Sequence, residues 1–218
     1  MSIGIEIAPF EASVLVRCTG VCGGGRTRVL GGARVRTATV GDATATGAER
    51  APTGFEAEFS RARAAHRLVE LLEVAGRPAA MDSYTAGNRH RYDIHRVTAP
   101  SDVTELLRNS WFSGYGELCG QPVRQRTTRQ VRHALALAGA AWRAALLVAG
   151  PTRSDAPGLR LPDLETAAAL VRAGRMLDVS VRMTTRPGGQ LVLVLPVGAP
   201  RLRLTEMLAE MTVMSSAA

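Results

Sequence analysis

Lysine is absent from this 218-residue sequence, in which all 27 basic residues are arginine. Aromatic residues are scarce at 4 %, so a core has to be built mainly from Ala, Leu and Val. The three cysteines are an odd and scattered number, which argues against a disulfide framework and indicates reduced thiols. Long apolar runs are missing as well, because none reaches the roughly 20 residues needed to cross a bilayer.

The start of the chain, MSIGIEIAPFEA, lacks the basic n-region of a signal peptide and carries two acids instead. Together with the missing apolar run, this predicts no membrane segment and a cytoplasmic location, at the nucleoid if the protein binds DNA. Hydrophobic residues make up 46 % of the chain, enough to bury a core in one large domain or in two small halves.

Acids are outnumbered by bases, 19 to 27, which gives a net charge of +8. A surface of this sign attracts polyanions and raises the rate of encounter with them. Nucleic acid is the commonest such partner, and the planar fork of arginine binds phosphate with two hydrogen bonds. The alternative is a GC-rich genome in which arginine replaces lysine, and charge alone leaves both interpretations open.

The order of the predicted elements divides the chain into two similar halves. We expect residues 1–110 to form the first half, residues 111–128 a linker with aromatics and glycines, and residues 129–218 the second half. Each half runs helix, strands, helix, hairpin, helix. This is an internal duplication with a period of roughly 110–130 residues, too long for a solenoid repeat.

The elements of the first half are predicted from apolar periodicity and glycine clusters. They are a short apolar helix at 11–22, strands within 23–40, a polar loop at 41–53, a strand at 54–60, a helix at 60–76, strands near 78–84 and 90–97, and a helix from 101 to about 109. The helix at 60–76 has Ser60 as its candidate N-cap and Gly76 as its candidate C′ residue. Its apolar face is formed by Leu68, Leu71, Leu72 and Ala75.

The second half repeats this pattern. Its predicted elements are a long Ala-rich helix at 128–150, a short strand within 159–164, a helix at 164–178, a hairpin of strands at 178–186 and 190–196, and a closing helix at 201–211. In the hairpin, the side chains alternate between two faces. One face should carry Val179, Val181 and Met183, and the other should carry Ser180, Arg182, Thr184 and Arg186.

The polar face of this hairpin strand contains arginine, threonine and serine but no acid. An antiparallel sheet with one face packed on helices and such a face turned outward is suited to binding phosphate. An ordinary solvated face would show the same alternation, and the sequence leaves both interpretations open.

Two helices that end in small residues and glycine, each followed by strands, resemble the layout of single-chain LAGLIDADG homing endonucleases. The matching segments are VLVRCTG at 14–20 and AALLVAG at 144–150. The resemblance implies an α+β fold of two pseudo-symmetric halves, each with a small antiparallel sheet packed on helices. It also implies that the two motif helices pack side by side through a seam of small residues. The expected seam residues are Val14, Val16, Gly20, Ala144, Ala145, Val148 and Gly150.

The chain is most similar to the N-terminal LAGLIDADG-like domain of the WhiA family of transcription regulators. AWRAALLVAGPTR at 141–153 resembles the family's second motif, and LPDLETAAALVRAGRMLDVSVRM at 161–183 resembles the segment after it. RVLGGARVRT at 28–37 is similar to the Gly-Gly hairpin after the first motif, and RHRYDIHRV at 89–97 to a basic strand. The match covers nearly the whole chain at low identity.

Two departures from these families bear on function. Metal-dependent cleavage needs acids at the ends of the two motif helices, where this chain has Thr19 and Ala149. Asp155 is the nearest substitute in the second half, but it lies in a loop beyond Gly150, so we expect no endonuclease activity. WhiA proteins also continue into a helix-turn-helix, whereas this chain ends at MTVMSSAA, so base readout by a recognition helix is not expected. A truncated chain and a natural stand-alone relative both remain open.

Other chemistry finds little support in the sequence. Cys18 and Cys22 have no second pair at zinc spacing, so we expect no metal and no cofactor. His66, His90, His95 and His133 are dispersed. The glycines at 23–25 lack the ending of a P-loop, and no G-x-S-x-G motif is present.

The function implied is that of a non-catalytic DNA-binding or transcription-regulatory protein of the WhiA type, in bacterial development, sporulation or cell division. The alternative is a protein-interaction module that binds a full-length WhiA or a WhiB-type partner without touching DNA. DNA would lie across the outward sheet faces, while the oligomeric state stays open. The expected contacts are Arg28, Arg34, Arg36, Arg91, Arg160, Arg182 and Arg186.

Overall fold

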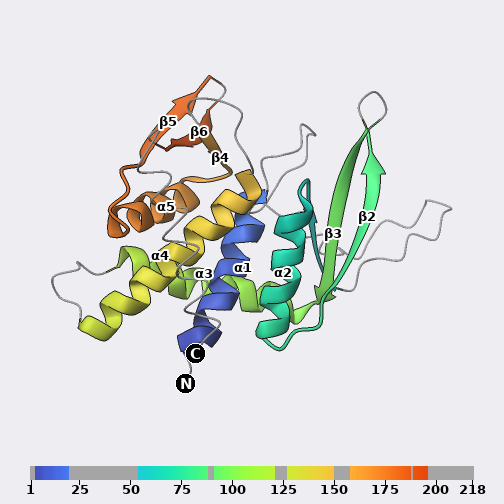
Figure 1. Cartoon of the computed structure of the whole chain (residues 1–218), viewed down its shortest axis with the longest axis horizontal. Coiled ribbons are helices and arrows are strands. Elements are labelled where there is room, and N and C mark those ends of the chain that lie inside the picture. Colours follow the sequence, from blue (N-terminus) through green and yellow to red (C-terminus); the bar gives the residue numbers. More distant parts are fainter. Residues whose placement is uncertain are drawn as a thin grey trace, which may run out of the picture.

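A computed structural model describes residues 3–19, 54–87, 91–120, 127–149, 158–187 and 189–195. The described residues form five helices and six strands (Figure 1). In chain order these are α1 (Ile3–Thr19), β1 (Gly54–Phe59), α2 (Ala62–Val74), β2 (Ala80–Ala86), β3 (Tyr92–Pro100), α3 (Asp102–Cys119), α4 (Thr128–Ala149), β4 (Gly158–Leu161), α5 (Leu164–Met176), β5 (Arg182–Arg186) and β6 (Gln190–Val194). The strands predicted within 23–40, the loop at 41–53 and the closing helix at 201–211 lie outside the described residues.

The two halves have the same topology. The first sheet has the strand order β1-β3-β2 and the second has β4-β6-β5, and every pairing in both is antiparallel. In each half one helix, α2 or α5, stands between the first strand and the hairpin. The fold is therefore α+β with two pseudo-symmetric halves, which confirms the fold class expected from the sequence.

The centre of the molecule is the contact between α1 and α4. These helices run side by side, with the first sheet on one side of the pair and the second sheet on the other (Figure 1). Small side chains allow this approach, because Ala12 on α1 and Ala138, Ala141 and Ala145 on α4 are fully buried. The two halves thus share one core rather than two.

Each sheet turns one face toward this core. In β1 the buried residues Phe55, Ala57 and Phe59 alternate with partly exposed ones, as a strand packed on one side requires. In the second sheet Leu159, Leu161 and Leu193 are buried in the same way. The opposite faces of both sheets point away from the helices.

Several predicted boundaries are confirmed and others are wrong. The amphipathic helix at 60–76 appears as α2, and its C-terminus has the hydrogen bonds of a Schellman motif, Gly76 N to Glu73 O and Arg77 N to Leu72 O. Its N-cap is Arg61 and not Ser60, and Ala75 is only partly buried. The first helix begins at Ile3, well before residue 11, and contains Pro9 in its first half.

The helix predicted to end near Asn109 continues to Cys119, so residues 111–119 of the predicted linker are helical. The physical reason is that its apolar stripe continues through Trp111, Gly114 and Leu118, all of them buried. Gly114 is needed there for packing, since a side-chain carbon at this position would collide with the ring of Phe10. A glycine interpreted as a sign of a linker is in fact a close helix contact.

Helix α4 is long and apolar enough to cross a membrane by length and composition, although the sequence had predicted no such run. More than half of its most apolar window is buried inside the fold, against α1 and α5. A central core helix passes the same test, so the length and apolarity of α4 agree with its position in the core.

Candidate nucleic-acid interface

The outward face of the second sheet collects three arginines. The register places Arg160 of β4 opposite Val192 of β6, which in turn lies opposite Thr184 of β5. Because Leu159 and Leu161 face the core, Arg160 points to the other side of the sheet. Arg182 and Arg186 lie two residues before and after Thr184 and therefore share its face.

These three arginines are exposed and make no ion pair with any described residue. The side chain of Arg186 reaches across the sheet, since one of its terminal nitrogens would lie 4.0 Å from a side-chain carbon placed on Gly158 of β4. Val192 of β6 lies between Arg160 of β4 and Thr184 of β5 and is 1 % exposed. The described strands of this sheet contribute no acid to the outward face.

The register places Met183 opposite the buried Leu193, on the face predicted for it, yet 47 % of Met183 is exposed. Val179 is buried and Val181 is partly buried, but both precede β5. All five residues of β5 are exposed because this strand is the edge of the sheet, paired only with β6 among the described strands.

The first half contributes fewer of the predicted contacts. Arg91 directly precedes β3 and is exposed. Arg28, Arg34 and Arg36 lie outside the described residues, so nothing places them on the sheet. The structure therefore brings together Arg160, Arg182 and Arg186 out of the seven arginines predicted to contact DNA.

The outward face of the first sheet is acidic in its described strands, whereas the sequence had led us to expect DNA contacts on both sheets. Glu58, Arg96 and Asp82 form one row across β1, β3 and β2, and Glu56 lies on the same face. Glu56 and Glu58 both hold the Arg96 guanidinium, at 3.1 Å from its Nε and 3.1 Å from a terminal nitrogen. The signal was present in GFEAEF, where alternation puts both glutamates on one side of the strand.

Tyr84 completes this network. Its hydroxyl donates to Glu58 Oε1 at 2.7 Å, and the Arg96 guanidinium lies over its ring at 4.9 Å. Desolvation raises the pKa of Tyr84, and the hydrogen bond to Glu58 adds to this shift. For Arg96, desolvation favours the neutral form, but the bonds to Tyr84 and to the two glutamates outweigh it and the pKa is raised.

Five of the seven predicted seam residues lie on α1 and α4, the two helices that pack together at the centre. Val14 and Val16 on α1 are buried, as are Ala144, Ala145 and Val148 on α4. Gly20 and Gly150 lie just beyond the two helices, outside the described residues. Thr19 and Ala149 are the last residues of α1 and α4. The Thr19 hydroxyl donates to Val16 O at 2.6 Å.

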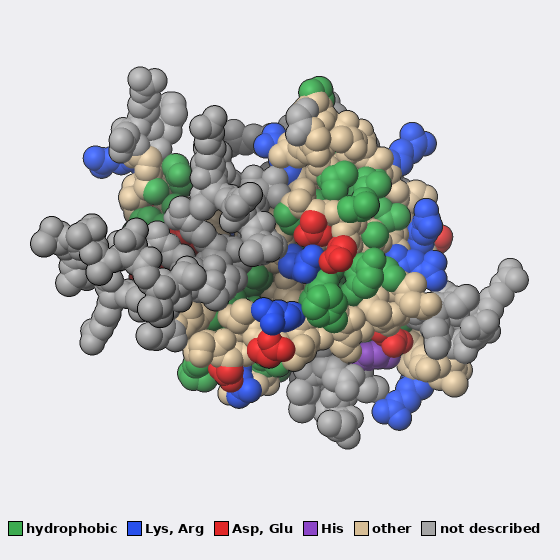
Figure 2. All heavy atoms as spheres, turned by 180° about the vertical axis from the view of Figure 1, so that it is seen from behind, with side chains coloured by type: hydrophobic (Ala, Val, Ile, Leu, Met, Phe, Trp, Pro, Cys, Tyr) green, Lys and Arg blue, Asp and Glu red, His purple; other side chains and the backbone are tan. Residues whose placement is uncertain are grey.

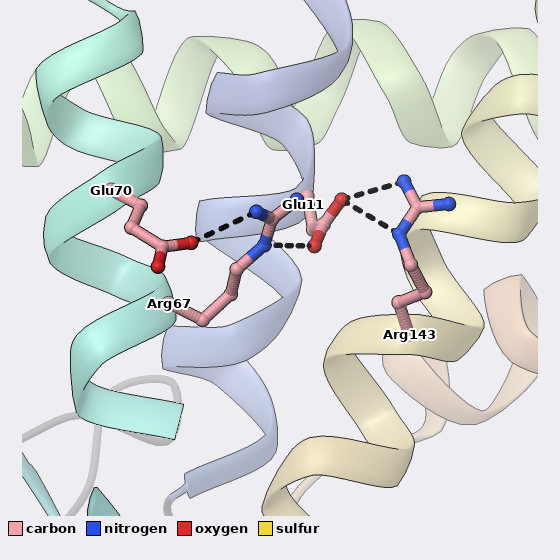
Figure 3. Close-up of polar contacts among 4 residues, drawn as sticks. All are labelled: Glu11, Arg67, Glu70 and Arg143. Carbon is pink, nitrogen blue, oxygen red and sulfur yellow. Dashed lines mark hydrogen bonds and ion pairs between the residues drawn. The ribbon is translucent and has the colours of Figure 1, made fainter. Parts of the chain in front are cut away.

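A buried ion-pair network crosses this seam, and no sequence pattern had indicated it (Figure 3). Glu11 of α1 is 1 % exposed. Arg67 of α2 donates from Nε to Glu11 Oε1 at 2.9 Å, and Arg143 of α4 donates to Oε2 at 2.7 and 3.2 Å. Arg67 also binds Glu70 at 3.0 Å. Burial alone would lower the pKa of Arg67, but these two carboxylates raise it.

A second charged contact joins the C-terminal end of α1 to the second half. Arg17 bonds to Asp163 at 3.3 Å and to Glu165 at 3.1 Å, and its guanidinium lies 4.0 Å from the centre of the Trp111 ring. Asp163 is at the same time the N-cap of α5, accepting a hydrogen bond from Thr166 N at 2.7 Å. Both contacts fix how the halves sit relative to one another.

The described residues contain no group of three or more His, Cys, Asp or Glu that could hold a metal ion. Cys18 is buried on α1, whereas Cys22 and His90 lie outside the described residues. Of the other histidines, His95 shares a hydrogen bond with Ser83 at 2.8 Å.

The described part of the face opposite that of Figure 1 shows both charge signs interspersed with apolar side chains (Figure 2). Phe112 and Leu164 are among the exposed apolar residues of the fold.

No protein-family model matches the chain. Curated relatives are similar to most of it: a probable cell division protein WhiA of Mycobacteroides abscessus is 33 % identical over 162 residues, covering 72 % of this chain and 49 % of the relative. Two further proteins of that name are 33 % identical in Parafrankia sp. and 31 % identical in Streptomyces avermitilis, each covering 64 % of this chain and 43 % of the relative. The chain thus spans half the length of these relatives or less.

Solved structures show a weaker likeness. The crystal structure of the N-terminal LAGLIDADG domain of WhiA has a TM-score of 0.48 at 13 % identity, covering 94 % of this chain and 87 % of that chain. The structure of I-DmoI in complex with DNA and Mn has a TM-score of 0.48 at 11 % identity, covering 91 % of this chain and 94 % of that chain. The similarity in sequence to the WhiA proteins carries more weight than either.

Proposed function

Because the chain is a WhiA-like LAGLIDADG-domain protein, we propose that it is a non-catalytic DNA-binding protein that regulates transcription. The curated relatives are named as cell division proteins and not as enzymes. Development, sporulation or cell division is the setting that follows for this chain, in the cytoplasm and at the nucleoid. A partnership with another transcription regulator belongs to the same proposal.

The observation that carries DNA binding is the outward face of the second sheet. Arg160, Arg182 and Arg186 are exposed there without an acid on the described strands. They stand on paired strands, so their backbone positions are fixed and only the side chains have to be ordered when phosphates bind. Contacts of this kind position a protein on the duplex and are independent of base sequence.

The absence of catalysis is proposed from the ends of the two central helices. Strand cleavage in this fold needs carboxylates there to hold a divalent cation. Thr19 and Ala149 take these two places, and neither can supply a carboxylate.

Fluorescence anisotropy on a labelled duplex, measured at several salt concentrations, tests the proposal. We expect binding at low salt whose logarithm falls linearly with the logarithm of the salt concentration, with a slope of about −0.9 for each phosphate contact. Absence of binding at low salt, or binding that does not respond to salt, would contradict it. Either result would favour the alternative, a protein-interaction module, which no described contact supports at present.

A further inference from the structure

The two sheets can be compared position by position. Helices α2 and α5 are both 13 residues long and begin at residues 62 and 164, an offset of 102. The same offset relates the outer strands of the sheets, where Glu58 corresponds to Arg160 and Asp82 to Thr184. The middle strands are offset by 96, from Arg96 to Val192. Equivalent residues therefore occupy equivalent places on the two outward faces.

At the equivalent positions of the outer strands the charge changes in one direction, while on the middle strands Arg96 is replaced by Val192, which removes one positive charge. Five positions of the outward face, taken from the first sheet to the second, are Glu56 and Gly158, Glu58 and Arg160, Ala80 and Arg182, Asp82 and Thr184, and Tyr84 and Arg186. At each of them the second sheet is more positive than the first by one charge, and by two where Arg160 replaces Glu58. The duplicated surfaces thus have opposite polarity in the described strands.

Among the described strands of the first sheet, the one arginine on the outward face is already paired. Arg96 is held by Glu56 and Glu58 at 3.1 Å each and packs on Tyr84. Binding a phosphate there would require breaking these charge-assisted contacts and bringing the phosphate close to two carboxylates. Like charges placed together across an interface oppose binding. The face can therefore not serve DNA as the second sheet does.

We propose that duplex DNA docks on the outward face of the second sheet alone, and that the acidic first sheet directs it there by repulsion. This rests on the proposed function, and it replaces the symmetric arrangement across both sheets expected from the sequence. Arg182 and Arg186 are four residues apart on one strand, roughly 13 Å. This distance matches about four base pairs of duplex at 3.4 Å each, so the contact is short and one-sided.

The phosphate contacts are located by anisotropy on individual variants. The quantity measured is the slope of the logarithm of the binding constant against the logarithm of the salt concentration. Arg160→Ala should reduce the slope by about one unit and Arg182→Ala/Arg186→Ala by about two, each lost contact weakening the salt response about 3.5-fold between 50 and 200 mM. Arg96→Ala, Glu58→Gln and Arg34→Ala/Arg36→Ala should leave the slope unchanged. Melting curves identify any variant that has not folded, and Glu58→Gln tests the first sheet if Arg96→Ala fails to fold.

Arg129→Ala/Arg132→Ala is the matched control. It removes the same charge as the double variant of β5, from exposed residues at the start of α4, which lies at the opposite end of this helix from the second sheet (Figure 1). Its slope should equal that of the wild type. A lower slope for Arg96→Ala or Arg34→Ala/Arg36→Ala, a higher one for Glu58→Gln, or an equal loss in the control would overturn one-sided docking. If the wild type itself does not bind, the proposed function fails instead.

Discussion

At the scale of single residues, Glu11 is the side chain whose environment is most demanding. It is 1 % exposed, and its two oxygens are held by arginines from two other helices. Such a buried network contributes little net stability compared with well-packed apolar residues. Removing Arg143 is different, because it leaves the buried Oε2 of Glu11 without its charged partner, while Arg67 still binds Oε1.

We therefore expect Arg143→Met to lower the free energy of unfolding by about 3 kcal/mol. Urea denaturation gives this value directly. Arg108→Met is the matched control, since Arg108 pairs with Glu105 at 2.9 Å but both side chains are 59 % exposed. It should cost less than about 0.5 kcal/mol. Equal losses for the two variants would show that Glu11 does not depend on Arg143.

This network also shows what the sequence could not predict. Glu11 lies 56 residues from Arg67 and 132 from Arg143, so no local spacing relates them. By contrast, Arg182 and Arg186 could be assigned to one face, because strand alternation is a local property. The exposure of Met183 could not be predicted in this way, because alternation gives the side of a strand but not whether that strand is an edge.

At the scale of elements, the residues at helix ends test how local backbone conformation affects stability. Gly76 has φ +72° at the end of α2, a conformation that costs other residues energy, and nothing lies within 4 Å of a side-chain carbon placed on it. Gly76→Ala should thus destabilise the fold by roughly 1 kcal/mol through backbone strain alone.

Gly116→Ala provides the opposite case on α3. This glycine is helical and exposed, and a side-chain carbon there meets no atom within 4 Å. The substitution should stabilise the protein by about 0.4–1 kcal/mol, because alanine restricts the unfolded chain. Thermal melting of both variants measures the difference, and two shifts of the same sign would contradict it.

The contact between α1 and α4 depends on small side chains. Ala145 is fully buried in it. Ala145→Trp should overpack this contact and lower the free energy of unfolding by at least about 1–3 kcal/mol. Arg132→Trp, at an exposed position of the same helix, is the control and should change the melting temperature little. An unchanged melting temperature for Ala145→Trp would show that the helix contact is not tightly packed.

Elements were predicted well where the apolar periodicity agreed with the residues at the helix ends. Helix α2 is an example, with its apolar face and Gly76 just after its end. The end of α3 was missed because a glycine is ambiguous in sequence: Gly114 permits the approach of Phe10, which lies more than a hundred residues away. Tertiary packing decides such positions, and local pattern cannot.

At the scale of the whole molecule, the duplication could be predicted because the order of elements is a property of the chain. Of the charges on its two outward sheet faces, only that of the second sheet was predicted from the sequence. The acid-free strand at 182–186 indicated the basic face. For the acidic face, alternation in GFEAEF gives only Glu56 and Glu58, and the pairing of β2 with β3 brings Asp82 to the same side. One fold thus has two outward faces of similar geometry and opposite charge, which a net charge of +8 conceals.

The same duplication sets an expectation for catalysis. Metal-dependent cleavage of DNA needs a divalent cation held by oxygen ligands, which the proposed function would place at the ends of the two central helices. Helix α1 ends at Thr19, whose hydroxyl already donates to Val16 O, and α4 ends at Ala149, which has no ligand atom. With no carboxylate at either position, a cation at this place would lack these two ligands.

We expect supercoiled plasmid to remain uncut when it is incubated with the purified protein and Mg²⁺ or Mn²⁺. Agarose gels quantify the nicked and linear forms over time, and a preparation from cells carrying the empty vector serves as the control. DNA binding should persist under the same conditions, which separates loss of chemistry from loss of contact. Nicking above the control that a chelator abolishes would show that other residues hold the metal, and the non-catalytic assignment would then be wrong.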